Sequence, residues 1–67
     1  MDTDRNAKSL EEKTAEEAAD RGASARAIGL YLGAERVYRA KGDYVSAERA
    51  RRQADIIDTD LRAWVED

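Results

Sequence analysis

The chain has 67 residues and a net charge of −3, and it contains no cysteine, histidine or proline. We therefore expect one small domain without disulfides or the common zinc sites, and no apolar run is long enough to span a membrane. The abundance of Ala, Glu and Arg predicts an all-α fold, and the Arg and Ala content hints at a bacterial or phage genome. No signal-peptide pattern is present, so a cytoplasmic protein is expected.

The first predicted helix runs from about residue 4 to residue 21, after an N-terminus (residues 1–5) that we expect to fray. Leu10 is its only large apolar residue, so its buried face must consist mainly of alanines. Because alanine buries little apolar area, we expect this helix to be the loosest element of the fold.

Gly22 marks the end of this helix, and Ser24 is a candidate N-cap for a second helix over about residues 25–41. Gly29 and Gly33 form a strip of small residues four apart, where we expect the first helix or another subunit to approach closely; the alternative is that both glycines are merely tolerated. Apolar side chains otherwise cover a wide arc of the second helix, which indicates neighbours on more than one side. They are Ile28, Leu30, Tyr31, Leu32, Ala34, Val37 and Tyr38.

Gly42 and Asp43 predict a tight turn, because glycine accepts the left-handed conformation past a helix end and aspartate is a good N-cap. The third helix, over about residues 43–65, is then an antiparallel neighbour of the second, and the chain is expected to form a small three-helix bundle. Its apolar stripe is spaced 3-4-3-4-3, small near the turn and large toward the C-terminus. The stripe consists of Ala47, Ala50, Ala54, Ile57, Leu61 and Trp64.

The helix pair over residues 28–61 also carries aromatic, turn and small residues in a familiar order: Tyr31, Tyr38, Gly42, Asp43, Tyr44, Ala47 and Ala54. In this it resembles one tetratricopeptide repeat, although Glu35, Arg51 and Thr59 depart from that family's pattern. The resemblance implies binding of a peptide or protein rather than chemistry. It also implies that a lone repeat needs the first helix, a second subunit or a partner to cover it.

No catalytic motif is recognisable, since no nucleophile–base pair can be assembled without histidine or cysteine. Adjacent carboxylates such as Glu11 and Glu12 are expected to be solvated on an exposed helix. We therefore expect a non-enzymatic protein that needs no metal and no cofactor.

A second face of the third helix, opposite the apolar stripe, combines Val45 and Ile56 with Arg49 and Arg52. This pattern favours a protein–protein interaction module, such as an adaptor, an inhibitor or a phage-type modulator of a host protein. The predicted partner-binding residues are Val45, Arg49, Arg52, Ile56, Arg36 and Arg39.

The alternative is a small nucleic-acid-binding transcriptional regulator, because Leu32-Gly33 and Val37-Tyr38-Arg39 resemble the two halves of a DNA-binding helix-turn-helix, although about two residues too few separate them. Arg36, Arg39, Arg49 and Arg52 would form a local basic patch within residues 21–54, which carry eight bases and three acids. However, residues 1–20 and 55–67 each carry a net charge of −4, and we favour neutralisation of the basic middle by these acidic ends. Binding of nucleic acid is therefore the less favoured prediction.

The second and third predicted helices carry more large apolar side chains than the first helix can cover, since Leu10 is the only large apolar residue of the first helix. We therefore predict a homo-oligomer, most simply a two-fold dimer. The predicted interface residues are Gly29, Leu30, Gly33, Val37, Leu61, Trp64 and Val65.

Overall fold

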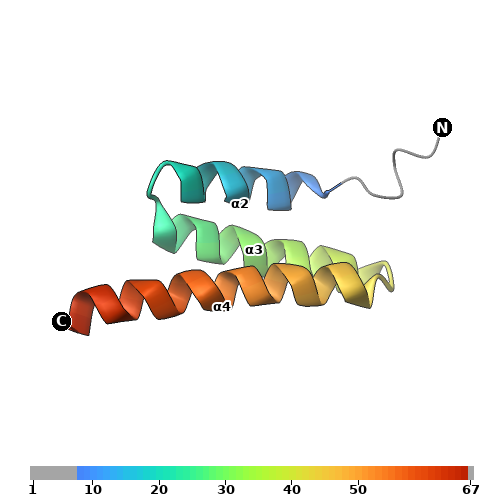
Figure 1. The fold of residues 1–67 in the computed structure, drawn as a ribbon. Coiled ribbons are helices and arrows are strands. Elements are labelled where there is room, and N and C mark those ends of the chain that lie inside the picture. Colours follow the sequence, from blue (N-terminus) through green and yellow to red (C-terminus); the bar gives the residue numbers. More distant parts are fainter. Residues whose placement is uncertain (1–7, 67) are drawn as a thin grey trace.

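Three α-helices, α2 (Leu10–Asp20), α3 (Ser24–Ala40) and α4 (Tyr44–Glu66), make up the computed structural model. It describes residues 8–66, with side chains described for residues 8–63. Successive helices run in opposite directions, and α3 lies between α2 and α4 (Figure 1). The predicted all-α three-helix architecture is confirmed, whereas the expected fraying of the first five residues concerns a part of the chain outside the described residues.

The helix α2 begins at Leu10, not near residue 4 as expected, and Lys8 and Ser9 precede it in a non-helical conformation. Ser9 is the N-cap, because its hydroxyl oxygen accepts the backbone N–H of Glu12 at 3.1 Å. The backbone N–H of Ser9 in turn donates to the hydroxyl oxygen of Tyr38 at 2.8 Å. These two bonds fix the start of the helix, and the second comes from a residue that local sequence does not bring nearby.

Both interhelical turns have the same construction, with a glycine in the left-handed region at φ +83° (Gly22) and φ +82° (Gly42). In each turn the N–H of the residue after the glycine donates to the carbonyl oxygen five residues earlier at 2.9 Å, which closes the helix end. The carboxylate of Asp43 caps α4 as predicted, by accepting a backbone N–H three residues later. Ser24 does not cap α3, since it is the first helical residue and Ala23 stands at the cap position.

The turn at Gly42 leads to a direct prediction. Replacing Gly42 by valine forces a β-branched residue into the left-handed region, and we expect a loss of about 1–2 kcal/mol, measured by thermal unfolding. Gly29→Val is the matched control, because a Cβ atom at Gly29 would meet nothing within 4 Å and its φ is not positive. Equal melting temperatures of the two variants would contradict the role of Gly42.

Among the described residues, alanine and tyrosine are the only fully buried apolar side chains, and Ile28, Leu30 and Ile57 pack against them. The buried apolar residues are Ala15, Ala18, Ala27, Tyr31, Ala34, Tyr38, Ala47, Ala50 and Ala54. The α4 stripe is buried at its three alanines, as predicted, but Leu61 remains 37% exposed and the side chain of Trp64 lies outside the described residues. Short alanine side chains allow the helices to approach closely and bury little area per residue.

The glycine strip of α3 does not receive α2, which corrects one of the two partners expected there. A Cβ atom at Gly29 or at Gly33 would meet nothing within 4 Å. The helix α2 packs instead against the α3 face that carries the buried alanines and tyrosines. Close approach of another subunit to this strip stays a prediction.

Candidate functional site

The most constrained polar group in the described residues is the carboxylate of Glu12, whose side chain is only 2% exposed. Arg49 of α4 binds it through two hydrogen bonds, from Nε to Oε2 at 3.1 Å and from Nη2 to Oε1 at 2.9 Å. The hydroxyl of Tyr38 on α3 donates to Oε1 at 2.6 Å. The guanidinium of Arg49 also lies 5.7 Å from the centre of the Tyr38 ring. This Glu12–Tyr38–Arg49 cluster joins all three helices.

The ionisation of Glu12 results from opposing influences. Burial is the largest single influence and raises the pKa, because it disfavours the charged form. The hydrogen bonds from Arg49 and Tyr38, together with the positive charge of Arg49, outweigh burial and hold the pKa of Glu12 below its ordinary value. Glu12 is therefore a charged acceptor at neutral pH, and it also favours the charged form of Arg49, whose pKa is raised by the hydrogen bond to Glu12.

A second carboxylate, Glu35 of α3, is also buried, with 8% of the residue exposed. Its Oε2 accepts Nε of Arg39 at 3.0 Å, and Nη1 of Arg51 lies 3.7 Å from its Oε1. Arg51 also forms an ion pair with Asp55 at 3.5 Å. This group links α3 to α4 on its own, without α2.

Both carboxylates are bound by arginines of the same chain. Every buried side-chain nitrogen or oxygen atom in the described residues has a hydrogen-bond partner. In the same residues, no three side chains from His, Cys, Asp and Glu come together as a metal-binding group. The arrangement holds helices together and fixes their register, which is a structural role.

The outer face of α4, defined by Val45, Arg49, Arg52 and Ile56, is largely open to solvent. Val45 is 81% exposed and Ile56 is 50% exposed, as expected for a surface that binds a partner. Arg49 departs from that expectation, because its guanidinium is committed to Glu12. Reversing its charge would damage the fold, so Arg49 is not a clean probe of docking.

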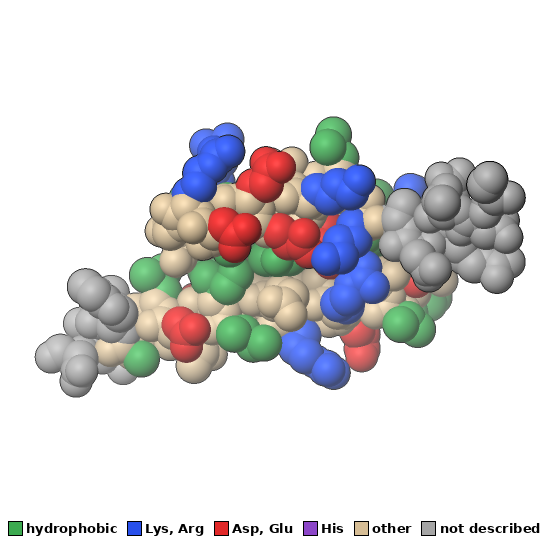
Figure 2. Space-filling model, turned by 45° about the horizontal axis from the view of Figure 1, so that its top comes forward, with side chains coloured by type: hydrophobic (Ala, Val, Ile, Leu, Met, Phe, Trp, Pro, Cys, Tyr) green, Lys and Arg blue, Asp and Glu red, His purple; other side chains and the backbone are tan. Residues whose placement is uncertain are grey.

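Several basic residues of α3 and α4 are paired with carboxylates. Arg39 pairs with Glu35, Arg49 pairs with Glu12 and Arg51 bridges Glu35 and Asp55, whereas Arg36 is exposed. Figure 2 shows the result on one face, where acidic side chains lie beside the basic ones. Arg36 and Arg39, both predicted to bind a partner, lie at the surface of α3, but Arg39 forms an ion pair with Glu35.

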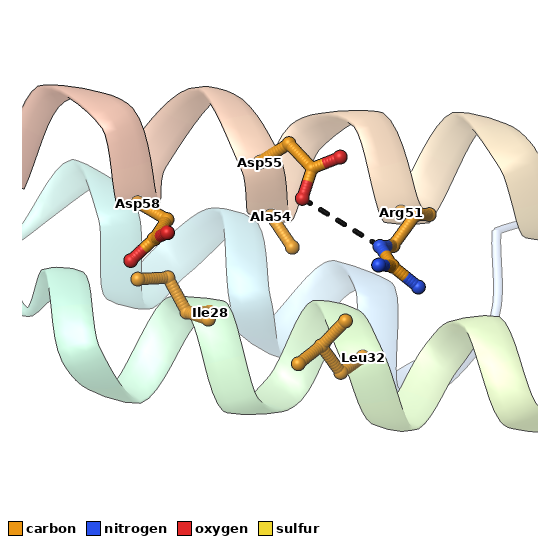
Figure 3. A pocket seen from close by; sticks show the side chains of 6 residues that line it. All are labelled: Ile28, Leu32, Arg51, Ala54, Asp55 and Asp58. Atoms are coloured by element: carbon orange, nitrogen blue, oxygen red, sulfur yellow. Dashed lines mark ion pairs between the residues drawn. The ribbon is translucent and has the colours of Figure 1, made fainter.

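A groove lies between α3 and α4, and the predicted partner-binding residues do not include its lining. Ile28 and Leu32 point from α3 toward α4, where Ala54 faces them, and the ion pair of Arg51 with Asp55 lies along one side (Figure 3). The groove is an open depression of about 320 Å³ lined by Ile28, Leu32, Arg51, Ala54, Asp55 and Asp58. We call it the α3/α4 groove.

The predicted oligomer residues lie on α3 and α4 and differ in their exposure. Leu30, Gly33 and Val37 are half-buried, and Leu30 packs against the core. Gly29 and Leu61 are exposed. The side chains of Trp64 and Val65 lie outside the described residues.

No helix in the described part of the chain combines the length and the apolar character needed to cross a membrane. Comparison with family models, with curated proteins and with solved structures finds no significant match to this chain. The resemblance of residues 28–61 to a tetratricopeptide repeat therefore stays a prediction.

Proposed function

We propose that this protein works by binding another protein, as an adaptor, an inhibitor or a modulator, and not by catalysis. One observation carries the proposal: in the described residues only alanine and tyrosine are fully buried among the apolar side chains, while several larger apolar side chains are exposed. The exposed large hydrophobic residues are Leu10, Leu32, Tyr44, Val45, Ile56 and Leu61. Each would contribute roughly 1.5–3 kcal/mol if a partner covered it fully, which favours association.

The α3/α4 groove is the surface best suited to a partner helix. Ile28 and Leu32 supply an apolar floor together with Ala54, and the charged side chains of Asp55 and Asp58 border it. An amphipathic helix that lays its apolar face into such a groove is a common mode of protein recognition. The pairing of Arg39, Arg49 and Arg51 with carboxylates supports a protein partner over a nucleic acid.

We also propose that the protein associates with itself, most simply as a two-fold dimer. The thin alanine core supports this, because a single small core rarely stabilises a chain of this length by more than about 3–5 kcal/mol. Association would then add to the stability, which should rise with protein concentration.

A capture experiment tests the partner proposal with a matched pair of variants. The tagged protein, Leu32→Glu and Leu10→Glu are each used as bait for an extract of the native host, with and without nuclease. Leu32 lies in the α3/α4 groove and is 40% exposed, whereas Leu10 lies on α2, away from the groove, and is 76% exposed.

We expect the wild-type protein and Leu10→Glu to retain the same protein after nuclease treatment, and Leu32→Glu to retain it at least about tenfold less well. The amount of protein retained should change little between low and moderate salt, whereas binding through phosphate contacts would weaken steeply. Retention of nucleic acid alone, or equal retention by the two variants, would contradict the proposal.

A further inference from the structure

The helix α4 has two faces with helical periodicity, and only one of them packs on α3. The buried face carries the alanine stripe. On the opposite side, a second series is spaced 4-3-4-3-4, the spacing with which helices contact each other over several turns. It consists of Val45, Arg49, Arg52, Ile56, Thr59 and Ala63. Apart from Arg49, which turns to Glu12, this face is available to another helix.

A depression on this face contains an apolar residue between two opposite charges. It is lined by Arg52, Asp55, Ile56, Thr59 and Asp60, with Ile56 half exposed at its centre. Arg52 precedes Ile56 by four residues and Asp60 follows it by four, so each lies about 6 Å along the helix axis from Ile56. The lining is therefore self-complementary about its midpoint.

Arg52 and Asp60 form no ion pair within the described residues, in contrast to the other arginines of α4. They cannot pair with each other, because eight helical residues separate them by about 12 Å. Arg51 and Arg62 each pair with an aspartate four residues away on α4. The charges that remain available on the described part of α4 thus include one of each sign on either side of Ile56, besides the exposed Glu48.

The charge of α4 changes sign along its length. Residues 44–53 carry three arginines and one glutamate, whereas residues 54–66 carry four acids and one arginine. Two copies of α4 side by side in the same direction would place like charges opposite each other. Two antiparallel copies place the basic half of each against the acidic half of the other, which is favourable at both ends of the contact.

We propose that the outer face of α4 is the docking surface for a second copy of this chain, bound antiparallel with the two-fold axis at Ile56. The proposal rests on the proposed self-association and assigns it a surface and a register. The two Ile56 side chains meet at the axis, and Arg52 of each copy meets Asp60 of the other. The contact is isologous and closed, so it yields a dimer and not a filament. The α3/α4 groove remains free for a different protein.

Charge reversal at the two ion pairs tests this register. In the Arg52→Asp variant two carboxylates would face each other at each contact, and in the Asp60→Arg variant two guanidinium groups would do so. We expect each single variant to raise the dimer dissociation constant by about tenfold or more, measured by sedimentation equilibrium. Arg36→Asp is the matched control, because Arg36 is an exposed arginine on α3 and should leave the constant unchanged.

The decisive arm is an equimolar mixture of Arg52→Asp with Asp60→Arg. In the mixed dimer, one contact joins the new carboxylate at position 52 of one chain to the new guanidinium at position 60 of the other. The second contact joins the native Arg52 to the native Asp60. The mixture should therefore dimerise like the wild type, although neither variant does so alone. The double variant, which carries both substitutions in one chain, should also dimerise. Helix destabilisation within one chain cannot produce this rescue, and circular dichroism of each variant checks the helical content. Failure of the mixture to dimerise would overturn the proposed register.

A cross-linking arm uses the absence of cysteine from the chain. Ile56→Cys places the only thiol at the two-fold axis, and mild oxidation should convert most of the protein into a covalent dimer. Arg26→Cys, at an exposed position near the start of α3, should remain monomeric under the same conditions. Equal cross-linking of the two variants would count against the axis at Ile56.

The outcomes separate this inference from the proposals on which it rests. A wild-type protein that stays monomeric to about a hundred micromolar would overturn self-association and this surface together. Dimerisation without rescue would overturn only the surface. Capture of a different protein through the α3/α4 groove depends on neither result.

Discussion

Replacing Glu12 by glutamine should destabilise the protein by about 2–3 kcal/mol, most of what a domain of this size has. Glutamine keeps the shape of the side chain but replaces one acceptor oxygen by an amide that donates, and that amide would face the donors of Arg49. Tyr38 would lose a charged acceptor. Urea unfolding followed by circular dichroism gives the difference.

The matched control is Glu17→Gln on the exposed side of the same helix, which should change the free energy of unfolding by no more than about 0.5 kcal/mol. If Glu12→Gln unfolds at the same urea concentration as the wild type at neutral pH, the cluster does not hold the helices.

The same pair of proteins gives a pH dependence whose sign follows from the lowered pKa of Glu12. A carboxylate with a lower pKa in the folded state contributes stability above its unfolded pKa, which is about 4.3 for glutamate, and loses it as the pH falls through the folded value. The difference between the wild type and Glu12→Gln should therefore be constant from about pH 6 to 8 and shrink below about pH 4.

Local chemistry made the helix boundaries at the Gly42 turn predictable from the sequence. Gly42 and Asp43 each act within a few residues of their own position, on a helix end and on the first turn of the next helix. Such short-range hydrogen bonds depend little on tertiary structure. The boundaries of α3 and α4 accordingly lie within one residue of those expected.

Tertiary contacts account for what the sequence did not reveal. Glu12 was expected to be solvated, and its burial depends on Arg49, which lies 37 residues away along the chain. One local signal was available: Ser9 followed three residues later by Glu12 is the pattern of a capping box. In the structure the hydroxyl oxygen of Tyr38 accepts the backbone N–H of Ser9. The Glu12 carboxylate therefore does not bond to Ser9 and accepts hydrogen bonds from Arg49.

The uneven charge of the chain also has a structural counterpart. The pair of Glu12 with Arg49 joins the acidic first twenty residues to the basic middle of the chain. This supports the favoured interpretation, in which the ends neutralise the middle. Arg52 and Asp60 are among the residues that form no such pair in the described part of the chain. Their proposed role toward a second copy could be inferred only after the structure had shown which arginines of α4 are already paired.

Replacing Ala34 by leucine should be the second most damaging change, with an expected loss of about 2 kcal/mol from overpacking. Ala34 is fully buried on α3, the helix that contacts both others, so three extra carbon atoms must push at least one neighbour away. Ala25→Leu is the matched control, since Ala25 is exposed on the same helix and its side chain can extend into solvent. Thermal unfolding at low protein concentration compares them without a contribution from association. A melting temperature of Ala34→Leu equal to that of Ala25→Leu would mean that α3 is not closely packed, and that the alanines reflect helix propensity instead.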